Sequence, residues 1–335
     1  MRVAVIGAGV AGLACALELA ERGATVQLIE RAGEPARAGC SWYAGGMLAP
    51  WCERENAEEL IATLGASGIA WWSARAATAR NGTLVVAHSR DALELTRFAR
   101  RTSHWQWLDG CDLRQLEPEL AERFDRALFF AEEAHLDPRS AMRSLVERLT
   151  TLGVALRYGV DATATALEAE VSIDCRGLAA RDVLSDLRGV KGEMLLVHSN
   201  EIQLARPVRI LHPRIPMYIV PRGAGLYMIG ATAIESEDAV RITARSVVEL
   251  LNGACVVHPA FGEAHIVELG TQVRAAFPDN LPKLRWHGRT LHVNGLYRHG
   301  FLLAPALAQM AAEMVLHDRC YPEVMDADHP QRRCS

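Results

Sequence analysis

The chain has 335 residues, of which half are hydrophobic and 23% are charged, as in a globular protein with room for two domains or one large composite unit. The net charge is −4, and the two signs are interspersed without a run of like charge. Nucleic acid is therefore not an expected partner. The eight cysteines form no C-x-x-C pair, so we expect no metal site and reduced thiols in a cytoplasmic protein.

The first thirty residues predict a strand, a glycine-rich turn, a helix and a second strand. Residues 2–6 and 25–30 are short apolar runs, and between them an apolar helical face carries Glu18 and Glu21 on its opposite side before Gly23 stops it. This N-terminus begins with a positive residue and runs apolar, as a signal peptide does, but the two glutamates favour a folded helix. No other segment reaches the roughly 20 apolar residues of a membrane-spanning helix, so no integral membrane segment is expected.

The turn after the first strand reads Gly7-Ala8-Gly9-Val10-Ala11-Gly12. In this pattern Gly7 permits a tight turn, Gly9 lets the backbone approach a pyrophosphate, and Gly12 allows close packing of helix against strand. The helix N-terminus offers unpaired amides to the phosphates, and Glu30 can accept hydrogen bonds from a ribose hydroxyl. The pattern predicts a bound dinucleotide and leaves FAD and NAD open.

The later elements alternate between α/β and antiparallel β character. We expect helices over 56–74, 91–101, 113–120 (interrupted at Pro118), 137–153, 243–252 and 304–316. We expect a hairpin around Asn81-Gly82, buried strands at 154–160 and 171–177, antiparallel strands at 193–199, 208–212, 217–222 and 226–232, and a strand at 264–269. This order predicts two domains that the chain crosses between several times.

Three further segments carry the remaining signal: GCSWYAGGMLAP at 39–50, MYIVPRGAGLYMIGAT at 217–232 and VNGLYRHGFLLAP at 293–305. Together with the N-terminal turn, this set resembles the FAD-dependent D-amino-acid oxidase superfamily over nearly the whole chain. It is most similar to the ThiO-type glycine oxidases of thiamine biosynthesis. The resemblance favours non-covalent FAD over NAD, and implies a homo-oligomer, commonly a tetramer.

The resemblance also implies a fold. It predicts a Rossmann-like, glutathione-reductase-type α/β FAD-binding domain, and an α+β substrate domain built on an antiparallel sheet. We expect residues 1–80, 135–187 and 273–335 in the FAD-binding domain, and residues 81–134 and 188–272 in the substrate domain.

The family pattern places one segment beneath the flavin ring, another along its other side, and a middle turn beside the adenosine. Small residues suit such a site because glycine lets backbone amides approach a flat ring. Cys175 is expected to be a packing residue without a redox role. The cofactor-binding residues implied in this way are Gly7, Gly9, Val10, Ala11, Gly12, Glu30, Arg31, Ser41, Ala44, Gly45, Gly46, Met47, Val160, Cys175, Gly177, Arg298, Gly300, Phe301 and Leu302.

Three residues resemble the family's catalytic positions. Tyr218 and Arg274 match the tyrosine and arginine that bind the substrate carboxylate, because a guanidinium offers parallel donors and stays charged when desolvated. Arg298 is a cation that can stabilise negative charge on the reduced ring. The chain departs from the family in having Gln-Val-Arg-Ala at 272–275 instead of Gly-Leu-Arg-Pro. It also has His299 where asparagine is common, either a structural residue or a titratable group near the flavin.

The implied reaction is oxidative deamination of glycine, with the imine passed to thiazole synthase and molecular oxygen converted to hydrogen peroxide. Sarcosine and small D-amino acids are further candidate substrates. Alternatives remain open at this point: another amine oxidase of the superfamily, a dehydrogenase that passes electrons to a quinone, an NAD(P)-dependent dehydrogenase or imine reductase, and a catalytically silent flavoprotein. An NAD(P) enzyme would keep the N-terminal turn without needing the two flavin-flanking segments.

Overall fold

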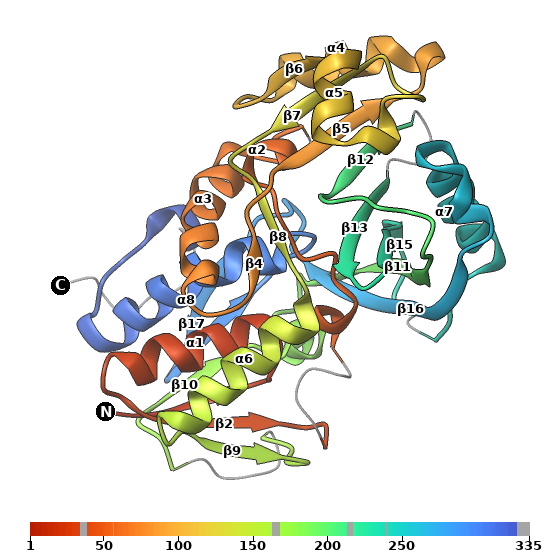
Figure 1. The fold of residues 1–335 in the computed structure, drawn as a ribbon. Helices are drawn as coiled ribbons and strands as arrows, with labels where there is room; N and C mark the ends of the chain where they lie inside the picture. The colour runs from red at the N-terminus through yellow and green to blue at the C-terminus, as the bar shows by residue number, and fades with distance from the viewer. Residues whose placement is uncertain (34–38, 56, 163–167, 213–216, 239, 327–335) are drawn as a thin grey trace.

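The computed structural model describes residues 1–33, 39–55, 57–162, 168–212, 217–238 and 240–326. Two large sheets organise them, one in the lower half of Figure 1 and one in its upper right. The first has six strands in the order β17 (Lys283–His287), β18 (Thr290–Asn294), β10 (Val171–Asp174), β1 (Arg2–Ile6), β2 (Thr25–Glu30) and β9 (Ala155–Tyr158).

The six-stranded sheet is parallel from β18 to β9, and β17 joins it as an antiparallel edge strand. Strand β1 lies between β10 and β2, and its three central residues are buried, as its uninterrupted apolar run predicts. The N-terminal run is therefore part of the core. Strand β9 was expected to be buried, but it alternates between exposed and half-buried residues because it is the other edge of the sheet.

Four helices pack with this sheet into the largest hydrophobic core: α1 (Val10–Glu21), α3 (Glu59–Ser73), α6 (Pro138–Thr151) and α8 (Gly300–His317). Helix α6 begins as predicted, because the Asp137 carboxylate accepts a hydrogen bond from the Ser140 amide at 2.6 Å. After it, Gly153 takes a positive φ of 75°. Helix α8 starts four residues before the predicted helix, so Gly300 and Phe301 lie in its first turn.

Helix α8 is the one helix among the described residues with the length and hydropathy to cross a membrane. Two thirds of it (67%) is buried inside the protein, against α1 and α3. We therefore interpret it as a core helix.

The nine-stranded sheet is mixed. Its strands are β15 (Ile234–Glu235), β11 (Arg188–His198), β14 (Leu226–Gly230), β13 (Met217–Gly223), β12 (Val208–Leu211), β5 (Thr83–Ala87), β7 (Arg126–Phe130) and β6 (Gln106–Asp109), with β16 (His265–Ala276) paired to β11. The predicted antiparallel strands are present and pair as β12–β13, β13–β14 and β11–β14, whereas β12 and β5 run parallel. Helices α4 (Ala92–Arg101), α5 (Gly110–Leu116) and α7 (Ala244–Val257) pack with this sheet.

The hairpin predicted at Asn81-Gly82 is wrong. Gly82 does have a positive φ of 78°, but the strands on its two sides belong to different sheets. Strand β4 (Thr78–Ala79) pairs with β8 (Ala134–Leu136), which also pairs with β3 (Met47–Leu48), whereas β5 pairs with β7 and β12. A turn residue sets the local backbone direction, but the partner of each strand is chosen by packing elsewhere.

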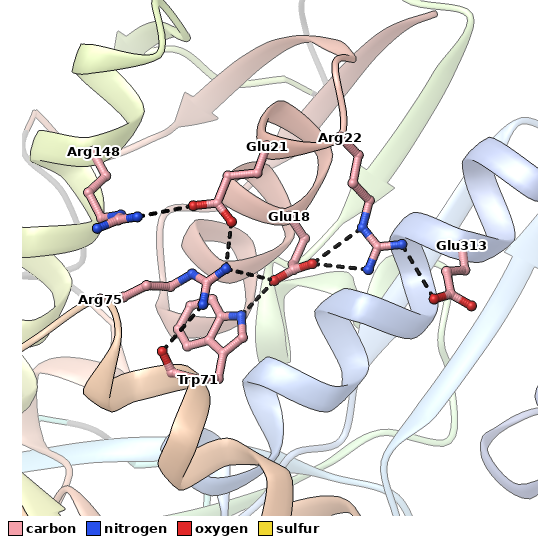
Figure 2. A network of polar contacts seen from close by, with 7 residues as sticks. All are labelled: Glu18, Glu21, Arg22, Trp71, Arg75, Arg148 and Glu313. Carbon is pink, nitrogen blue, oxygen red and sulfur yellow. Dashed lines mark hydrogen bonds and ion pairs between the residues drawn. The ribbon is translucent and has the colours of Figure 1, made fainter.

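A network of seven side chains ties the helices of the first core together (Figure 2). At its centre, the buried Glu18 of α1 accepts hydrogen bonds from Trp71 at 2.6 Å and from Arg22 at 3.1 Å, and lies 3.5 Å from Arg75. The remaining members are Glu21, Arg148 and Glu313. The network joins α1 to α3, α6 and α8.

The cysteines differ in one respect from the expectation of free thiols. Cys15, Cys40, Cys52, Cys111, Cys175 and Cys255 are free, whereas Cys320 is disulfide-bonded. Cys334 lies outside the described residues. Disulfide pairing cannot be deduced from cysteine spacing, which is why the sequence did not predict the bond.

The fold is the predicted α/β domain with a mostly parallel sheet, joined to an antiparallel-rich α+β region. The proposed domain division assigns every strand of the six-stranded sheet to the FAD-binding domain. Its boundary at residue 273 falls inside β16, which Figure 1 shows running from the upper-right sheet toward the lower one.

Candidate active site

One cavity of about 480 Å³ lies where the glycine-rich turn, the segment 39–47 and strands of both large sheets meet. This volume is typical of a site for a cofactor or small ligand. Every residue that the sequence assigned to cofactor or substrate lines it, with the exception of Gly12.

The glycine-rich turn needs its glycines for packing. Gly7 has a φ of 98°, and a Cβ there would lie 2.8 Å from the Cys175 carbonyl oxygen. A Cβ on Gly12 would lie 1.8 Å from the Gly7 carbonyl oxygen, so Gly12 permits the close contact between helix and turn instead of lining the cavity. The tight turn leaves the first turn of α1 facing the cavity through Val10 and Ala11.

Polar groups beside this turn are held in place by the backbone. The two carboxylate oxygens of Glu30 accept hydrogen bonds from the Ala8 amide at 2.7 Å and the Ala32 amide at 2.9 Å. Ser41 Oγ accepts one from the Val10 amide at 3.1 Å, which joins the segment 39–47 to the start of α1. Each acceptor keeps lone pairs for a further donor.

The turn after β10 is fixed by an ion pair. Asp174 accepts hydrogen bonds from the Arg176 amide and from its guanidinium, both at 2.9 Å. Burial raises the pKa of Asp174, but the hydrogen bonds from His292 and Arg176 outweigh it and hold the pKa below its usual value. Cys175 is buried and faces Cys15, and both this contact and desolvation raise the pKa of its thiol. A neutral thiol fits the packing role expected for Cys175.

The segment 39–50 is more regular than its sequence indicates. It contains a 3₁₀ turn at Cys40–Tyr43, the short strand β3, and the start of α2 (Pro50–Glu53). The Arg139 guanidinium lies 4.6 Å from the centre of the Trp42 ring, and its Nε donates to the Trp42 carbonyl at 3.2 Å. These contacts hold the aromatic end of the segment in place.

The paired glycines of this segment face the cavity, but protein atoms also crowd them. A Cβ on Gly45 would lie 2.7 Å from the Tyr218 ring. Gly46 has a φ of 70°, and a Cβ there would lie 2.2 Å from the Leu136 carbonyl oxygen. Close approach to a flat ring is therefore not the only reason for glycine at these positions, because a side chain would also clash with Tyr218 or Leu136. Sequence reasoning missed this steric reason because both of these residues are distant in the chain.

Tyr218 lies on β13, four residues before Arg222, which secures the glycine segment from the same strand. The Arg222 guanidinium donates to the carbonyl oxygens of Ala44 at 3.0 Å and Gly45 at 2.9 Å. Strand β13 therefore supplies both a residue of the cavity lining and the support of the segment opposite it.

Arg274 extends from β16 into the cavity. Its Nη1 donates to the Thr232 carbonyl oxygen at 3.0 Å. Burial lowers the pKa of Arg274, and the positive charge of Arg298 acts in the same direction, whereas Tyr218 raises it. Among the described residues, no carboxylate forms an ion pair with this guanidinium. A partly desolvated cation without an anionic partner is costly unless a ligand supplies the partner.

Glu53, at the end of α2, also lines the cavity, and sequence reasoning missed it. Its carboxylate lies 3.8 Å from Arg298, 3.6 Å from His299 Nδ1 and 3.4 Å from Arg209. Burial raises the pKa of Glu53, but Arg298, His299, Arg209 and Arg274 together lower it to about 2. The carboxylate is therefore ionised at neutral pH. The one signal in the sequence was a glutamate three residues after the segment 39–50.

His299 is buried beside Glu53, where its ring meets that of Tyr297 edge to face. Burial lowers the pKa of His299 to about 4; Glu53 opposes this shift, and the neighbouring arginines add to it. The imidazole is neutral between pH 5 and 8. His299 is the residue immediately before α8, and it also lines the cavity.

The residues present fit an FAD molecule. The turn at Gly7–Gly12 and the start of α1 suit a pyrophosphate, Glu30 suits a ribose, and the segments 44–47 and 298–302 line the part of the cavity that also contains Tyr218 and Arg274. The residues that line the cavity come from strands of both large sheets. The cavity can therefore hold an elongated cofactor with its nucleotide part at one sheet and its ring part at the other.

Comparison with known proteins agrees with this fit. The family model described as DAO, FAD dependent oxidoreductase, matches residues 2–314. A putative thiamine biosynthesis oxidoreductase ThiO of Rhizobium etli is 55% identical over 96% of this chain and 99% of its own length. A bifunctional ThiO/ThiG protein of Nostoc is 28% identical over 96% of this chain, which spans about half (53%) of that protein.

A glycine oxidase of Geobacillus kaustophilus is 27% identical over 93% of this chain and 92% of its own. A crystal structure of glycine oxidase from that organism superposes with a TM-score of 0.80 at 23% identity, covering 94% of both chains. These similarities extend over the whole fold and include both sheets that form the cavity. The protein therefore belongs to the DAO family of FAD-dependent oxidoreductases, and its cofactor is FAD.

Proposed function

We propose that this FAD-dependent amino-acid oxidase oxidises glycine to its imine, with hydrogen peroxide as the second product. The observation that carries the proposal is Arg274, a half-buried guanidinium that lines the cavity beside Tyr218 and has no carboxylate partner among the described residues. A carboxylate is the ligand that completes such a site, because the guanidinium offers two parallel donors. The small-amine part of the proposal is supported by the relatives named glycine oxidase.

The protein residues act by binding and orientation. Arg274 and the Tyr218 hydroxyl anchor the substrate carboxylate, and this fixes the direction of the α-carbon. FAD, when bound, supplies the hydride acceptor. Arg298 adds positive charge to the same part of the cavity, balanced in part by Glu53 at 3.8 Å. The amino group enters neutral, so no side chain has to serve as a general base.

Glycine requires little space beyond the clamp. Glu53 brings an ionised carboxylate to the cavity lining, which disfavours a second carboxylate on the substrate. Sarcosine and D-alanine differ from glycine by a single methyl group, and a methyl group in a pocket changes binding by only about 1–3 kcal/mol. We therefore propose them as weaker substrates.

We further propose that the imine supplies the thiazole part of thiamine through thiazole synthase, in the cytoplasm. The names of the Rhizobium and Nostoc relatives support a place in this pathway, and the fused ThiO/ThiG chain supports direct transfer to a partner enzyme. A tetrameric assembly is part of the same proposal.

The test is anaerobic reduction of the holoenzyme flavin by glycine, sarcosine and D-alanine in parallel, with methylamine as a control that lacks the carboxylate. We expect bleaching of the flavin absorbance by glycine and none by methylamine. Bleaching by methylamine at the glycine rate would overturn the carboxylate clamp. Peroxide should then appear in step with oxygen consumption, and turnover without peroxide would point to another electron acceptor.

A further inference from the structure

The strand beneath Arg274 contains a lysine, a glycine and a glutamate whose contacts the proposed mechanism does not yet use. They are residues 191–193 of β11, which pairs antiparallel with β16 so that Val190 lies opposite Arg274 and Gly192 lies opposite Gln272. The Arg274 side chain reaches diagonally across this pair. A Cβ on Gly192 would lie 2.2 Å from Arg274 Nη2 and 2.4 Å from Cζ. The guanidinium therefore lies directly on the Gly192 backbone.

Glu193 fixes Thr232, the residue that accepts the hydrogen bond of Arg274. It is fully buried, and three hydrogen bonds join it to Thr232: Glu193 N donates to Oγ1 at 2.9 Å, Oγ1 donates to Oε2 at 3.2 Å, and Thr232 N donates to the Glu193 carbonyl at 3.2 Å. The Thr232 carbonyl in turn accepts from Arg274 Nη1 at 3.0 Å. Glu193 therefore fixes the residue that fixes the guanidinium.

Lys191 balances the charge of Glu193. Its buried ammonium lies 3.2 Å from Glu193 Oε1 and donates to the Arg241 carbonyl at 2.7 Å, and Oε1 also accepts from the Thr243 amide at 3.0 Å. The carboxylate is thus fully partnered away from Arg274. Arg274 donates to the neutral Thr232 carbonyl and to no carboxylate among the described residues. This hydrogen bond orients the guanidinium without neutralising its charge.

We propose that Lys191, Gly192 and Glu193 are positioning residues that hold Arg274 in its carboxylate-binding orientation, an inference that rests on the proposed role of Arg274 as the clamp. Gly192 provides the space, Glu193 fixes Thr232, and Lys191 fixes the Glu193 carboxylate. A cation placed in this way keeps its charge for the substrate, and little side-chain entropy remains to be lost on binding.

The experiment titrates the purified holoenzyme with acetate, a carboxylate without an amino group, and follows the flavin absorbance. The variants are Glu193→Gln and Gly192→Ala, each in the wild-type and the Arg274→Lys background. The three atoms nearest to a Cβ on Gly192 all belong to the flexible end of the Arg274 side chain, so Gly192→Ala should displace the guanidinium without opening the sheet. Glu235→Gln is the matched control, because this exposed carboxylate on β15 pairs with Arg188 and not with Thr232.

We expect each variant to raise the acetate Kd and the glycine KM about tenfold, with a smaller change in the limiting rate of flavin reduction. The control should match the wild type, and in the Arg274→Lys background the effect should largely disappear. A purely structural role would lower the melting temperature without this coupling to Arg274.

The possible outcomes separate the two proposals. If Arg274→Lys weakens acetate binding but Glu193→Gln and Gly192→Ala bind acetate like the wild type, the positioning role is wrong and the clamp stands. If the variants weaken binding equally in both backgrounds, they act elsewhere and the inference is overturned. If Arg274→Lys and Arg274→Leu both bind acetate like the wild type, the clamp itself is wrong and the positioning role falls with it.

Discussion

The network between α1, α3, α6 and α8 and the charged lining of the cavity are built from the same residue types but are balanced differently. In the network of Figure 2 every charge has an opposite partner: Glu18 faces Arg22 and Arg75, Glu21 faces Arg75 and Arg148, and Arg22 also reaches Glu313. In the cavity, Glu53 faces several cations, and Arg274 faces a carbonyl oxygen and no ionised partner among the described residues.

The difference separates a structural role from a binding role. A closed network offers nothing to a ligand, and its value lies in joining helices whose packing would otherwise depend on apolar contacts alone. A cation left without an anion costs stability in the folded protein, and this cost is recovered when a carboxylate binds. Substitutions in the two regions should therefore have opposite effects on stability and activity.

The largest effect is expected for Arg274→Leu. Losing a charge-assisted, bidentate contact with the substrate should lower kcat/KM for glycine about 100- to 1,000-fold, equivalent to about 3–4 kcal/mol. The melting temperature should stay the same or rise, because the change removes a desolvated cation. Stopped-flow reduction under anaerobic conditions and thermal unfolding measure the two quantities, and an unchanged kcat/KM would rule out Arg274 as the clamp.

Glu18→Ala should show the reverse. It leaves Trp71 without its acceptor and removes one of the two carboxylate partners of Arg22 and Arg75 in a buried site, so the free energy of unfolding should fall by about 3 kcal/mol. Glycine reduction by the folded protein should not change. Chemical denaturation gives the stability, and Glu18→Gln, which keeps the shape and one acceptor, should lose less. A Glu18→Ala protein as stable as the wild type would show that the network is dispensable.

In the wild type, the folded-state pKa of His299 makes the free energy of unfolding fall by about 1–3 kcal/mol as the pH drops from 6.5 to 4, and His299→Gln should remove this fall. The folded pKa of about 4 lies below the ordinary value of 6.5, so the unfolded chain binds the proton more readily between these values. The contribution of His299 is fully present above pH 6.5 and is lost as the pH falls toward 4. The difference in unfolding free energy between wild type and variant, measured from pH 4 to 7, should follow this course, and a constant difference would contradict it.

Arg148→Ala should have the smallest effect. This residue contacts Glu21 at 3.3 Å, and its side chain is 44% exposed, so water and salt screen the pair. We expect a loss below about 0.5 kcal/mol in unfolding free energy and unchanged activity. A loss as large as that of Glu18→Ala would mean that the network acts as one cooperative unit.

Local patterns carried much of the fold. The glycine spacing with its flanking apolar runs predicted the first strand, turn, helix and strand, and Asp137-Pro138 predicted the start of α6. The antiparallel strands from 193 to 232 were also predicted, with the turn before Leu226. Such features depend on residues close together in the chain, where capping, turn chemistry and periodicity act directly.

The errors came from partners distant in the chain. The Asn81-Gly82 turn looked like a hairpin, but its two flanking strands pair in different sheets. Glu53 was missed because its place in the site depends on ion pairs with Arg209 and Arg298. These two arginines approach it from β12 and from the turn before α8. Neither relation leaves a periodic trace in the sequence.

By itself, the sequence determined the dinucleotide turn, the family resemblance and a set of site residues that all line the cavity, with the exception of Gly12. Each of these residues belongs to a short motif with its own backbone requirement. Only the tertiary structure decided which of those residues keep an unbalanced charge. Burial and the closure of ion pairs are properties of surroundings assembled from distant segments: Thr232 and Gly192 beneath Arg274, and Glu53 beside Arg298. The desolvation of a guanidinium, and therefore its availability to a carboxylate, exists only once those segments have come together.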